Sequence, residues 1–348
     1  MQEIKLDYII VGQGLAGTWL SYELLNRDQK ILVINDDKAD TSSKKAAGLY
    51  NPITGRKMVK TWRANALFDG LENSYKILEK LLDNRFLFPK PIYRPFAAPA
   101  DQNDWEGKLD DNAISDFVED IKRESVGIQH IADPNGGILL RSCGYVDIPT
   151  LLRGYKDYLI NKGVYVEEVF DYSEMKMESE TVQYKNWVAK KVIFCEGPFL
   201  SNPYWKELPF RPVRGEVMDI TCDLKTDFII NQGVFMIPKE NHYTVGSTYD
   251  HKTLTFEPQE EGIKNLEQRL SKIYCGSYRI IQKRAGVRPA THDRKPYIGF
   301  HKKFGTIGIF NGFGTKGVSL SPYFASHFAD VLVEAKELDK EVDVERVL

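Results

Sequence analysis

The sequence predicts an α/β fold of two domains, in which an antiparallel sheet is inserted into an α/β domain assembled from separated pieces of the chain. Residues 7–34 give a strand, a glycine-rich turn, a helix and a second strand, which is the order of a β–α–β unit. The middle of the chain is rich in proline, aromatic residues and short strand-like runs. Near its end the chain returns to a strand and an apolar helix. A length of 348 residues suits two domains.

The elements of the first half follow from periodicity. Apolar, β-branched runs predict strands at 7–11 and 30–34, and a helix at 18–27 lies between them. Residues 35–45 are polar and predict a loop, whereas residues 61–83 have helical periodicity. From residue 84 onward, prolines and aromatic residues indicate a different architecture.

The second half alternates in the same way. A helix is predicted near 145–162, with strands near 164–169, 182–187 and 191–195. A β-rich zone follows, with a strand at 213–222 and a hairpin at 233–249. A helix at 260–273, strands at 279–287 and 305–311 and a helix at 321–337 complete the chain.

The turn after the first strand is Gly12-Gln13-Gly14-Leu15-Ala16-Gly17, which spells G-x-G-x-x-G. The first glycine allows a tight turn, the second lets a phosphate approach the backbone, and the third lets the helix pack closely on the strand. The helix N-terminus then faces a pyrophosphate. An acid is expected at the end of the second strand to bind a ribose, and Asn35 stands there with Asp36 next to it. The motif predicts a dinucleotide site, with NAD and FAD both open and a ligand-free glycine turn as the alternative.

A second G-x-G-x-x-G lies near the C-terminus, in Gly312-Phe313-Gly314-Thr315-Lys316-Gly317. A second dinucleotide domain, for NAD(P)H, would need a strand ending in an acid after the following helix. The chain has no convincing strand there, so we reject that interpretation.

Bulk properties exclude several classes of function. The net charge of −2 gives no overall basic field for nucleic acid or an anionic membrane. No apolar run approaches the length of a membrane span, and no signal peptide is evident. The six histidines are scattered, so we expect no metal site. The four cysteines are far apart, and we expect them to be reduced and buried in a cytoplasmic protein.

Six segments occur in an order and spacing that resemble the D-amino-acid oxidase superfamily, particularly its glycine oxidase and sarcosine oxidase branch. They are "DYIIVGQGLAG", "KKVIFCEG", "FRPVRGEVMDI", "FMIPKENHYTVGSTY", "AGVRPATHDRKPYIG" and "NGFGTKGVSLSP". The resemblance spans nearly the whole chain. It implies a Rossmann-like FAD-binding domain of the glutathione-reductase type, made of residues 1–83, 145–210 and 282–348. Residues 84–144 and 211–281 would then form the substrate-binding domain.

The resemblance also implies that the cofactor is FAD and which residues bind it. Gly12 to Gly17 would hold the pyrophosphate, and Asn35-Asp36 would lie at the ribose. Backbone and side chains along the rest of the cofactor would come from Ser42, Ser43, Ala47, Gly48, Leu49, Val169, Cys195, Glu196 and Gly197. Gly312, Gly314, Thr315, Lys316 and Gly317 would lie beside the flavin at the start of the last helix, whose positive end favours negative charge on the reduced flavin. Lys316 would add to this, unless it is a solvated surface lysine.

Arg288, in "GVRP", is the residue that the resemblance places at a substrate carboxylate. A guanidinium matches a carboxylate bidentately and so fixes orientation as well as charge. A structural arginine in a surface salt bridge is the alternative. The implied reaction is oxidation of a C–N bond of a small amino acid or N-substituted glycine, with hydride transfer to flavin N5 and reoxidation by dioxygen or another acceptor. Positioning is then the main contribution of the protein, so we name no general base.

The sequence departs from the family around the substrate. Phe235 replaces a tyrosine that helps to hold the carboxylate in glycine oxidases, and Gly233 replaces a neighbouring polar residue. Tyr249 adds a phenol, and Tyr50-Asn51 stand where smaller residues are usual. The substrate pocket is therefore expected to be remodelled, with Tyr249 and Tyr50 as substrate contacts. No cysteine follows Cys275, so we expect non-covalent FAD.

Two alternative functions remain open. The segment "KKAAGLYNPITGR" is similar to the oxidase half of bifunctional enzymes that trim carboxymethylaminomethyl-uridine in tRNA. Basic residues that could contact RNA lie beside it, namely Lys44, Lys45, Arg56, Lys57, Lys60 and Arg63, although a solvated loop and helix face is the simpler account. The altered pocket also allows a flavin-binding protein with no amine turnover.

Overall fold

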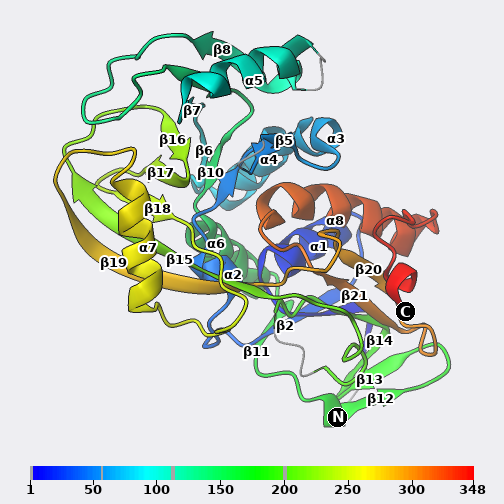
Figure 1. The fold of residues 1–348 in the computed structure, drawn as a ribbon. Coiled ribbons are helices and arrows are strands. Elements are labelled where there is room, and N and C mark those ends of the chain that lie inside the picture. The colour runs from blue at the N-terminus through cyan, green and yellow to red at the C-terminus, as the bar shows by residue number, and fades with distance from the viewer. Residues whose placement is uncertain (1–2, 56–57, 111–113, 199–201) are drawn as a thin grey trace.

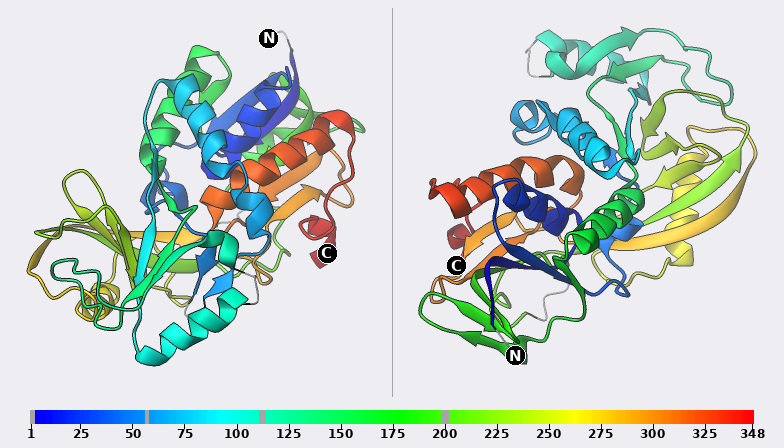
Figure 2. Two further views of the ribbon diagram at one scale, coloured as in Figure 1. Left: turned by 90° about the horizontal axis from the view of Figure 1, so that it is seen from above. Right: turned by 180° about the vertical axis from the view of Figure 1, so that it is seen from behind.

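The computed structural model describes residues 3–55, 58–110, 114–198 and 202–348. Two large sheets lie side by side, one mainly parallel and one mainly antiparallel (Figure 1). Both ends of the chain lie on the side of the parallel sheet, away from the antiparallel one, in every view of Figure 2. The predicted fold class is therefore confirmed.

The parallel sheet has the strand order β11 (Tyr165–Glu167), β2 (Ile31–Asn35), β1 (Ile4–Val11), β14 (Trp187–Phe194) and β21 (Ile307–Asn311). Strand β20 (Tyr297–Phe300) pairs antiparallel with β21, and β12 (Met175–Met177) and β13 (Val182–Tyr184) extend the sheet beside the start of β14. Val11 pairs with Ile34 on one side and with Phe194 on the other. The carboxyl ends of these three strands therefore lie at one edge of the sheet, where ligands bind in such folds.

Alternating side chains of β1 fill two cores. Tyr8 and Ile10 face a cluster with the helices, whereas Ile9 and Val11 face a second cluster with Phe194. The helices of the first cluster are α1 (Leu15–Leu25), α3 (Ala64–Phe68), α4 (Leu71–Leu82), α6 (Ile148–Asn161) and α8 (Gly317–Glu334). A strand buried on both faces has no polar alternation, which explains the continuous apolar runs of the sequence.

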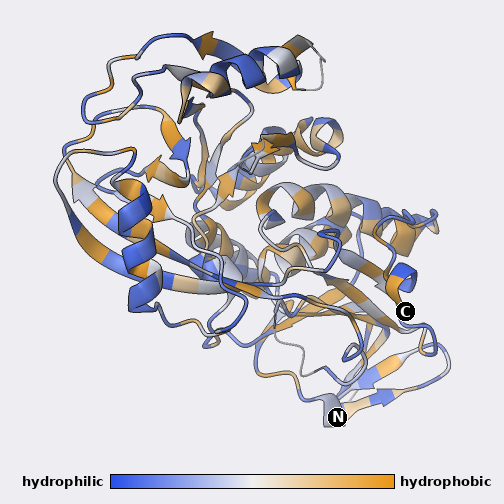
Figure 3. Ribbon diagram, viewed as in Figure 1, coloured by the Kyte–Doolittle hydropathy of each residue, from blue (hydrophilic) through white to orange (hydrophobic). Residues whose placement is uncertain are grey.

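The antiparallel sheet is ordered β19 (Tyr278–Arg288), β15 (Val213–Cys222), β18 (Tyr243–Gly246), β17 (Val234–Pro238), β16 (Ile229–Gln232), β7 (Ile92–Pro95), β9 (Gly137–Leu140) and β8 (Val118–Lys122). Within it β16 and β7 are parallel. Helix α7 (Glu260–Leu270) buries Ile263, Leu266 and Leu270 against one face of the sheet and turns a hydrophilic surface outward (Figure 3). Helix α5 (Pro99–Asp110) covers the far end.

Short elements join the two parts. Strands β3 (Leu49–Tyr50), β10 (Gly144–Val146) and β6 (Leu87–Pro89) form a small sheet, and β4 (Ile53–Thr54) pairs with β5 (Val59–Lys60). Helix α2 (Ser42–Lys45) packs on β19 at Gly286, where a Cβ would be 3.2 Å from the Cβ of Lys45. The loop expected at residues 35–45 therefore contains a short helix.

The predicted elements exist, with shifted bounds. The helix expected over residues 61–83 is two helices, α3 and α4, because Gly70 adopts φ +77° at the start of the second. The strands expected at 182–187 and 191–195 are β13 and the longer β14, and the hairpin at 233–249 is β17–β18. Strands β6 to β10 and helix α5, from the proline-rich and aromatic part of the chain, were not predicted individually.

Helix α8 begins four residues before its predicted start and contains Pro322. Proline has no N–H to donate to the carbonyl four residues earlier, which is that of Val318. The hydroxyl of Tyr75 donates to this carbonyl instead, at 2.9 Å. A tertiary contact therefore makes proline tolerable inside the helix, and the sequence around Pro322 does not reveal it.

The remaining predictions have mixed outcomes. All four cysteines are free, but Cys275 is exposed and Cys222 is half-buried, so the expectation that all are buried is wrong. Among the described residues, no helix is long and apolar enough to cross a membrane, and no three metal-ligating side chains gather. The domain boundaries at residues 84, 145, 211 and 282 stay a prediction.

Candidate cofactor and substrate site

The first glycine motif packs against the end of β14. Gly12 has φ +99°, and a Cβ there would lie 2.7 Å from the carbonyl oxygen of Cys195. A Cβ at Gly17 would lie 1.9 Å from the carbonyl oxygen of Gly12. Neither position has room for a side chain, so the backbone itself forms the surface beyond β1, as a dinucleotide requires.

The N-terminus of α1 is open to an anion. Gly14 is its N-cap and provides no side-chain cap, so the helix itself leaves N–H groups of the first turn without an intrahelical partner. The N–H of Leu15 donates to the Oγ of Ser43 at 3.2 Å, which places α2 beside the motif. A pyrophosphate fits this arrangement of glycine backbone, helix N-terminus and serine.

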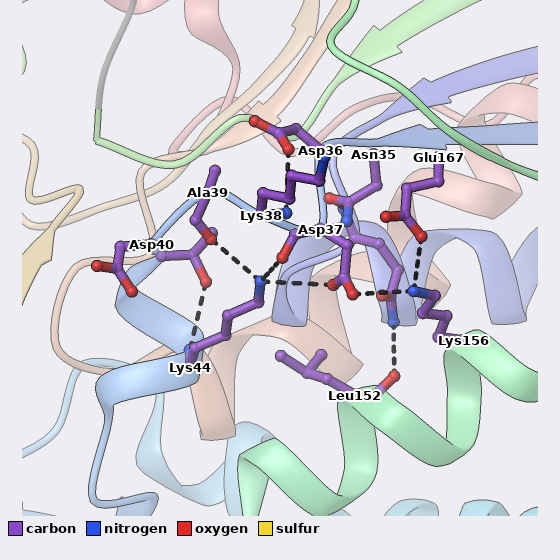
Figure 4. Close-up of polar contacts among 12 residues, drawn as sticks. Asn35, Asp36, Asp37, Lys38, Ala39, Asp40, Lys44, Leu152, Lys156 and Glu167 are labelled. Carbon is purple, nitrogen blue, oxygen red and sulfur yellow. Dashed lines mark hydrogen bonds and ion pairs between the residues drawn. The ribbon is translucent and has the colours of Figure 1, made fainter.

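Asn35 is the last residue of β2 (Figure 4), and part of its hydrogen-bonding capacity is used by the glycine loop. Its Oδ1 accepts from the N–H of Gln13 at 2.8 Å, and its Nδ2 donates to the hydroxyl of Tyr165 at 3.2 Å. Asp36 accepts from the N–H of Lys38 at 3.0 Å. Asn35 therefore organises the loop, which leaves one lone pair and one amide hydrogen for a ribose.

Asp37, which the sequence analysis did not single out, connects α2 and α6 (Figure 4). Its carboxylate lies 2.8 Å from the ammonium of Lys156 and 3.4 Å from that of Lys44. The hydrogen bond from Lys156, followed by the charge of Lys44, holds the pKa of Asp37 below its usual value. Lys156 also bonds Glu167 at 2.9 Å, and these carboxylates raise the pKa of Lys156. The cluster fixes the loop that follows β2 against α6 and β11.

The end of β14 supplies the other predicted backbone positions. Cys195 is buried, and burial raises the pKa of its thiol. Glu196 accepts from the hydroxyl of Tyr172 and from Nδ2 of Asn202, and burial still raises the pKa of Glu196. The carbonyl of Gly197 accepts from Nδ2 of Asn311 at 2.9 Å. Asn311 is the last residue of β21, so it ties the two strand ends together.

The second glycine motif lies next to the first. A Cβ at Gly317 would be 3.3 Å from Cδ1 of Leu15, and Gly312 and Gly314 have φ +86° and +54°. Thr315 is exposed. The ammonium of Lys316 donates to Oγ1 of Thr61 at 3.2 Å, and burial lowers its pKa. Lys316 is thus a half-buried cation at the N-terminus of α8 and not a solvated surface lysine.

The run expected along the flavin edge crosses between the sheets. Gly48 has φ +79°, and a Cβ there would lie 1.8 Å from the carbonyl oxygen of Val146. Ala47 and Leu49 pack against the same apolar cluster as Phe235. Tyr50 points the other way, because its hydroxyl donates to Glu72 at 2.9 Å and its side chain is buried with the helices.

Arg288 lies at the end of β19, across the strand β15. A Cβ at Gly215 would be 2.0 Å from its Nη2, so only glycine lets the guanidinium lie flat there. Nη1 donates to the carbonyl of Thr248 at 3.2 Å, and Nη2 donates to Oγ of Ser247 at 2.9 Å. The ring of Tyr249 covers it, with its centroid 4.7 Å from Cζ. Burial lowers the pKa of Arg288.

The structure therefore brings together most of the predicted residues and separates two. The glycine motifs, Ser42, Ser43, Cys195, Gly197 and Lys316 line one region between the sheets, with Ala47 and Leu49 extending toward Phe235. Val169, which follows β11, is 72% exposed, and Tyr50 of the small sheet is buried against the helices. Asp37, Asn311, Ser247 and Thr248 were missed. Only Asn311 carries a sequence signal, as a polar residue that ends an apolar strand directly before a glycine motif.

Fold and site together indicate a class of protein, the dinucleotide-binding α/β proteins with an added antiparallel sheet, here one that carries a largely buried arginine. The family model described as FAD dependent oxidoreductase matches residues 7–331, and the chain belongs to this family. It is therefore an FAD-dependent oxidoreductase, and the choice between NAD and FAD falls on FAD.

Individual relatives are distant. The chain is 23% identical to glycine oxidase from Bacillus licheniformis over 94% of this chain and 93% of that protein. It is 21% identical to a bifunctional protein of tRNA 5-methylaminomethyl-2-thiouridine biosynthesis from Leptospira interrogans, over 96% of this chain and 58% of that protein. The crystal structure of glycine oxidase from Geobacillus kaustophilus superposes with a TM-score of 0.79 at 18% identity and covers 99% of each chain.

Proposed function

We propose that this protein oxidises the C–N bond of a small amino acid or N-substituted glycine, and that Arg288 binds the substrate carboxylate. The cofactor is FAD, for which we infer non-covalent binding by the glycine motifs, Ser43 and the end of β14. When bound, FAD accepts a hydride from the carbon next to the substrate nitrogen. The contribution of the chain is to orient that carbon.

The observation that carries the proposal is the missing counter-ion of Arg288. No carboxylate of the described residues lies within salt-bridge distance of its guanidinium, and burial lowers its pKa although the charge of the more distant Glu216 opposes this. A buried charge without a partner is costly, and a bidentate carboxylate would stabilise it. The alternative of a surface salt bridge therefore has no acid to supply it within the described part of the chain.

The surroundings of Arg288 fit a small, partly apolar substrate. Phe235 lies on the same face of the sheet as Gly246, whose Cβ would be 2.6 Å from the Phe235 ring. Val217 faces the same point, because the Cβ of Gly246 would lie 2.7 Å from its methyl group. This carboxylate would thus be held by charge at Arg288, and the carbon atoms next to it by apolar contact with Phe235 and Val217.

The first test is anaerobic absorption of the holoenzyme before and after addition of small amino acids such as glycine, sarcosine and proline. Bleaching of the flavin bands is expected, and oxygen consumption or reduction of a dye then identifies the acceptor. Flavin that no amine bleaches would contradict amine oxidation and favour a flavin-binding protein without turnover.

Arg288→Lys tests the carboxylate contact directly. Loss of the planar fork should raise KM for the best amino acid about 10- to 100-fold. Arg279→Lys is the matched control, because Arg279 is exposed on the same strand. An unchanged KM in Arg288→Lys would refute the assignment.

A tRNA substrate is less well supported. Three of the basic residues considered for RNA are already paired: Lys44 with Asp37, Lys45 with Asp40, and Arg63 with Asp339 and Glu341. Arg56 and Lys57 lie outside the described residues. A gel shift with total tRNA at low salt tests this alternative, and a shifted tRNA band would support it.

A further inference from the structure

Two arginines from different elements donate hydrogen bonds to one residue, Ser247, which directly follows β18. Arg288 of β19 donates to its side-chain Oγ at 2.9 Å. Arg269, in the last turn of α7, donates from Nη1 to its backbone carbonyl at 3.0 Å. Arg269 also donates to the carbonyl of Gly233, and its Nη1 lies 3.4 Å from Oδ1 of Asn265. The two guanidinium groups are therefore held on either side of a single residue.

Neither guanidinium is paired directly with an acid in the described part of the chain. Among the described residues no carboxylate forms a salt bridge with Arg269 or Arg288. Two acids of this region are engaged by another residue, because Arg214 pairs with Glu216 at 2.8 Å and with Asp250 at 3.1 Å. Burial lowers the pKa of both Arg269 and Arg288. The charge of Glu216 opposes this at Arg288, but Glu216 is paired with Arg214 and forms no salt bridge with Arg288.

Both arginines keep N–H groups available. A guanidinium has five N–H donors, and the hydrogen bonds described above use two on Arg288 and three on Arg269. Tyr249 marks the solvent side of this region, since it is 64% exposed, covers Arg288 and interacts electrostatically with Arg269. A ligand that enters past Tyr249 would meet two cations.

We propose that the substrate carries two carboxylates, one bound by Arg288 and the second by Arg269, which makes it an acidic amino acid or an amine of equivalent charge. The inference rests on the proposed function for the first carboxylate and adds Arg269 as the residue that determines specificity. A dianion would compensate the largely buried charge of Arg288 and the partly buried charge of Arg269, whereas a neutral side chain leaves Arg269 without an anion.

The kinetic test compares aspartate with asparagine and glutamate with glutamine, in both enantiomers, using the holoenzyme. Each pair differs by one charge at nearly constant shape. The acidic member is expected to have at least a tenfold higher kcat/KM, and Arg269→Gln should reduce that ratio about tenfold. Lys272→Gln, which removes an exposed charge just beyond α7, is expected to leave the ratio unchanged. Equal loss for acidic and neutral substrates in Arg269→Gln would show a structural clamp and overturn the proposal.

A binding test separates this inference from the proposed function. Succinate and butyrate have no amine and cannot be oxidised as amines, yet they differ by the second carboxylate. Succinate is expected to perturb the flavin absorption at a concentration at least tenfold lower than butyrate, and Arg269→Gln should remove the difference. Equal affinities in the unmodified protein would overturn the two-carboxylate site even if amino acids are oxidised, and a difference would uphold it even if none is.

Discussion

Glu216 offers a direct test of how the antiparallel sheet holds Arg288. Its carboxylate is fully buried on β15 and accepts from Nη2 of Arg214 and from the hydroxyl of Thr248. The backbone carbonyl of Thr248 in turn accepts a hydrogen bond from Nη1 of Arg288 at 3.2 Å. The side chain lies tightly against α7, because a Cβ at Gly262 would be 2.5 Å from it. Glu216→Gln keeps the volume and removes only the charge.

The size of the effect follows from what remains around Arg214. Its Nε and Nη1 are buried without a partner among the described residues, so loss of Glu216 leaves the guanidinium with Asp250 alone. Breaking a buried ion pair costs about 3–5 kcal/mol. Because Asp250 keeps part of the compensation, we expect Glu216→Gln to lower the free energy of unfolding by about 3 kcal/mol.

Urea denaturation of the holoenzyme measures this change, and Asp250→Asn is the matched control. The Asp250 side chain is 27% exposed, so its loss should cost less than about 1 kcal/mol. Weakened support of Thr248 should also raise KM for the amino-acid substrate in Glu216→Gln. A destabilisation below 1 kcal/mol, or equal effects of the two variants, would refute the reasoning.

Two further predictions concern stability. Tyr75→Phe removes the hydroxyl that donates to the carbonyl of Val318 and should lower the free energy of unfolding by about 1–3 kcal/mol. Pro322→Ala restores an N–H for that carbonyl and should recover part of this loss in the double variant. Strictly additive effects of the two substitutions on the urea midpoint would count against this. The ammonium of Lys239 lies 3.3 Å from the ring centroid of Tyr145, and burial lowers the pKa of Lys239 to about 7. Between that pH and the ordinary lysine pKa the unfolded chain binds more protons than the folded one, so the free energy of unfolding rises with pH, by up to about 1.4 kcal/mol per unit. Lys239→Met should therefore be stabilising near pH 7 and less so near about pH 9, and a pH-independent difference would contradict the titration.

The parts of the site that could be predicted are local in sequence. The glycine loop needs only a strand, three glycines and a helix, and all of these lie within residues 4–25. The alternation of a strand explains the placement of Tyr50, which was expected in the pocket beside Leu49. Adjacent residues of β3 point to opposite faces, so Leu49 reaches the Phe235 cluster and Tyr50 reaches the helices.

The parts that could not be predicted depend on partners far along the chain. Arg63 resembles an RNA-binding residue in the sequence, but its acids are Asp339 and Glu341, from the C-terminal segment. The groups that hold Arg288 are the carbonyl of Thr248 and the hydroxyl of Ser247, some 40 residues away. Every residue has a backbone carbonyl, so the residue type does not show which carbonyl will bind an arginine. These contacts of Arg288 can therefore be identified only from the fold.

Helix α2 connects the glycine loop to the strand that carries Arg288. The Oγ of Ser43 accepts from Leu15 in the dinucleotide loop, whereas the Oγ of its neighbour Ser42 donates to the carbonyl of Val287, directly before Arg288. Gly286 lets the helix approach β19 closely enough for both contacts. Two adjacent serines thus fix the glycine loop relative to the end of β19, and under the proposed function this coupling would place the reacting carbon by geometry, without a general base.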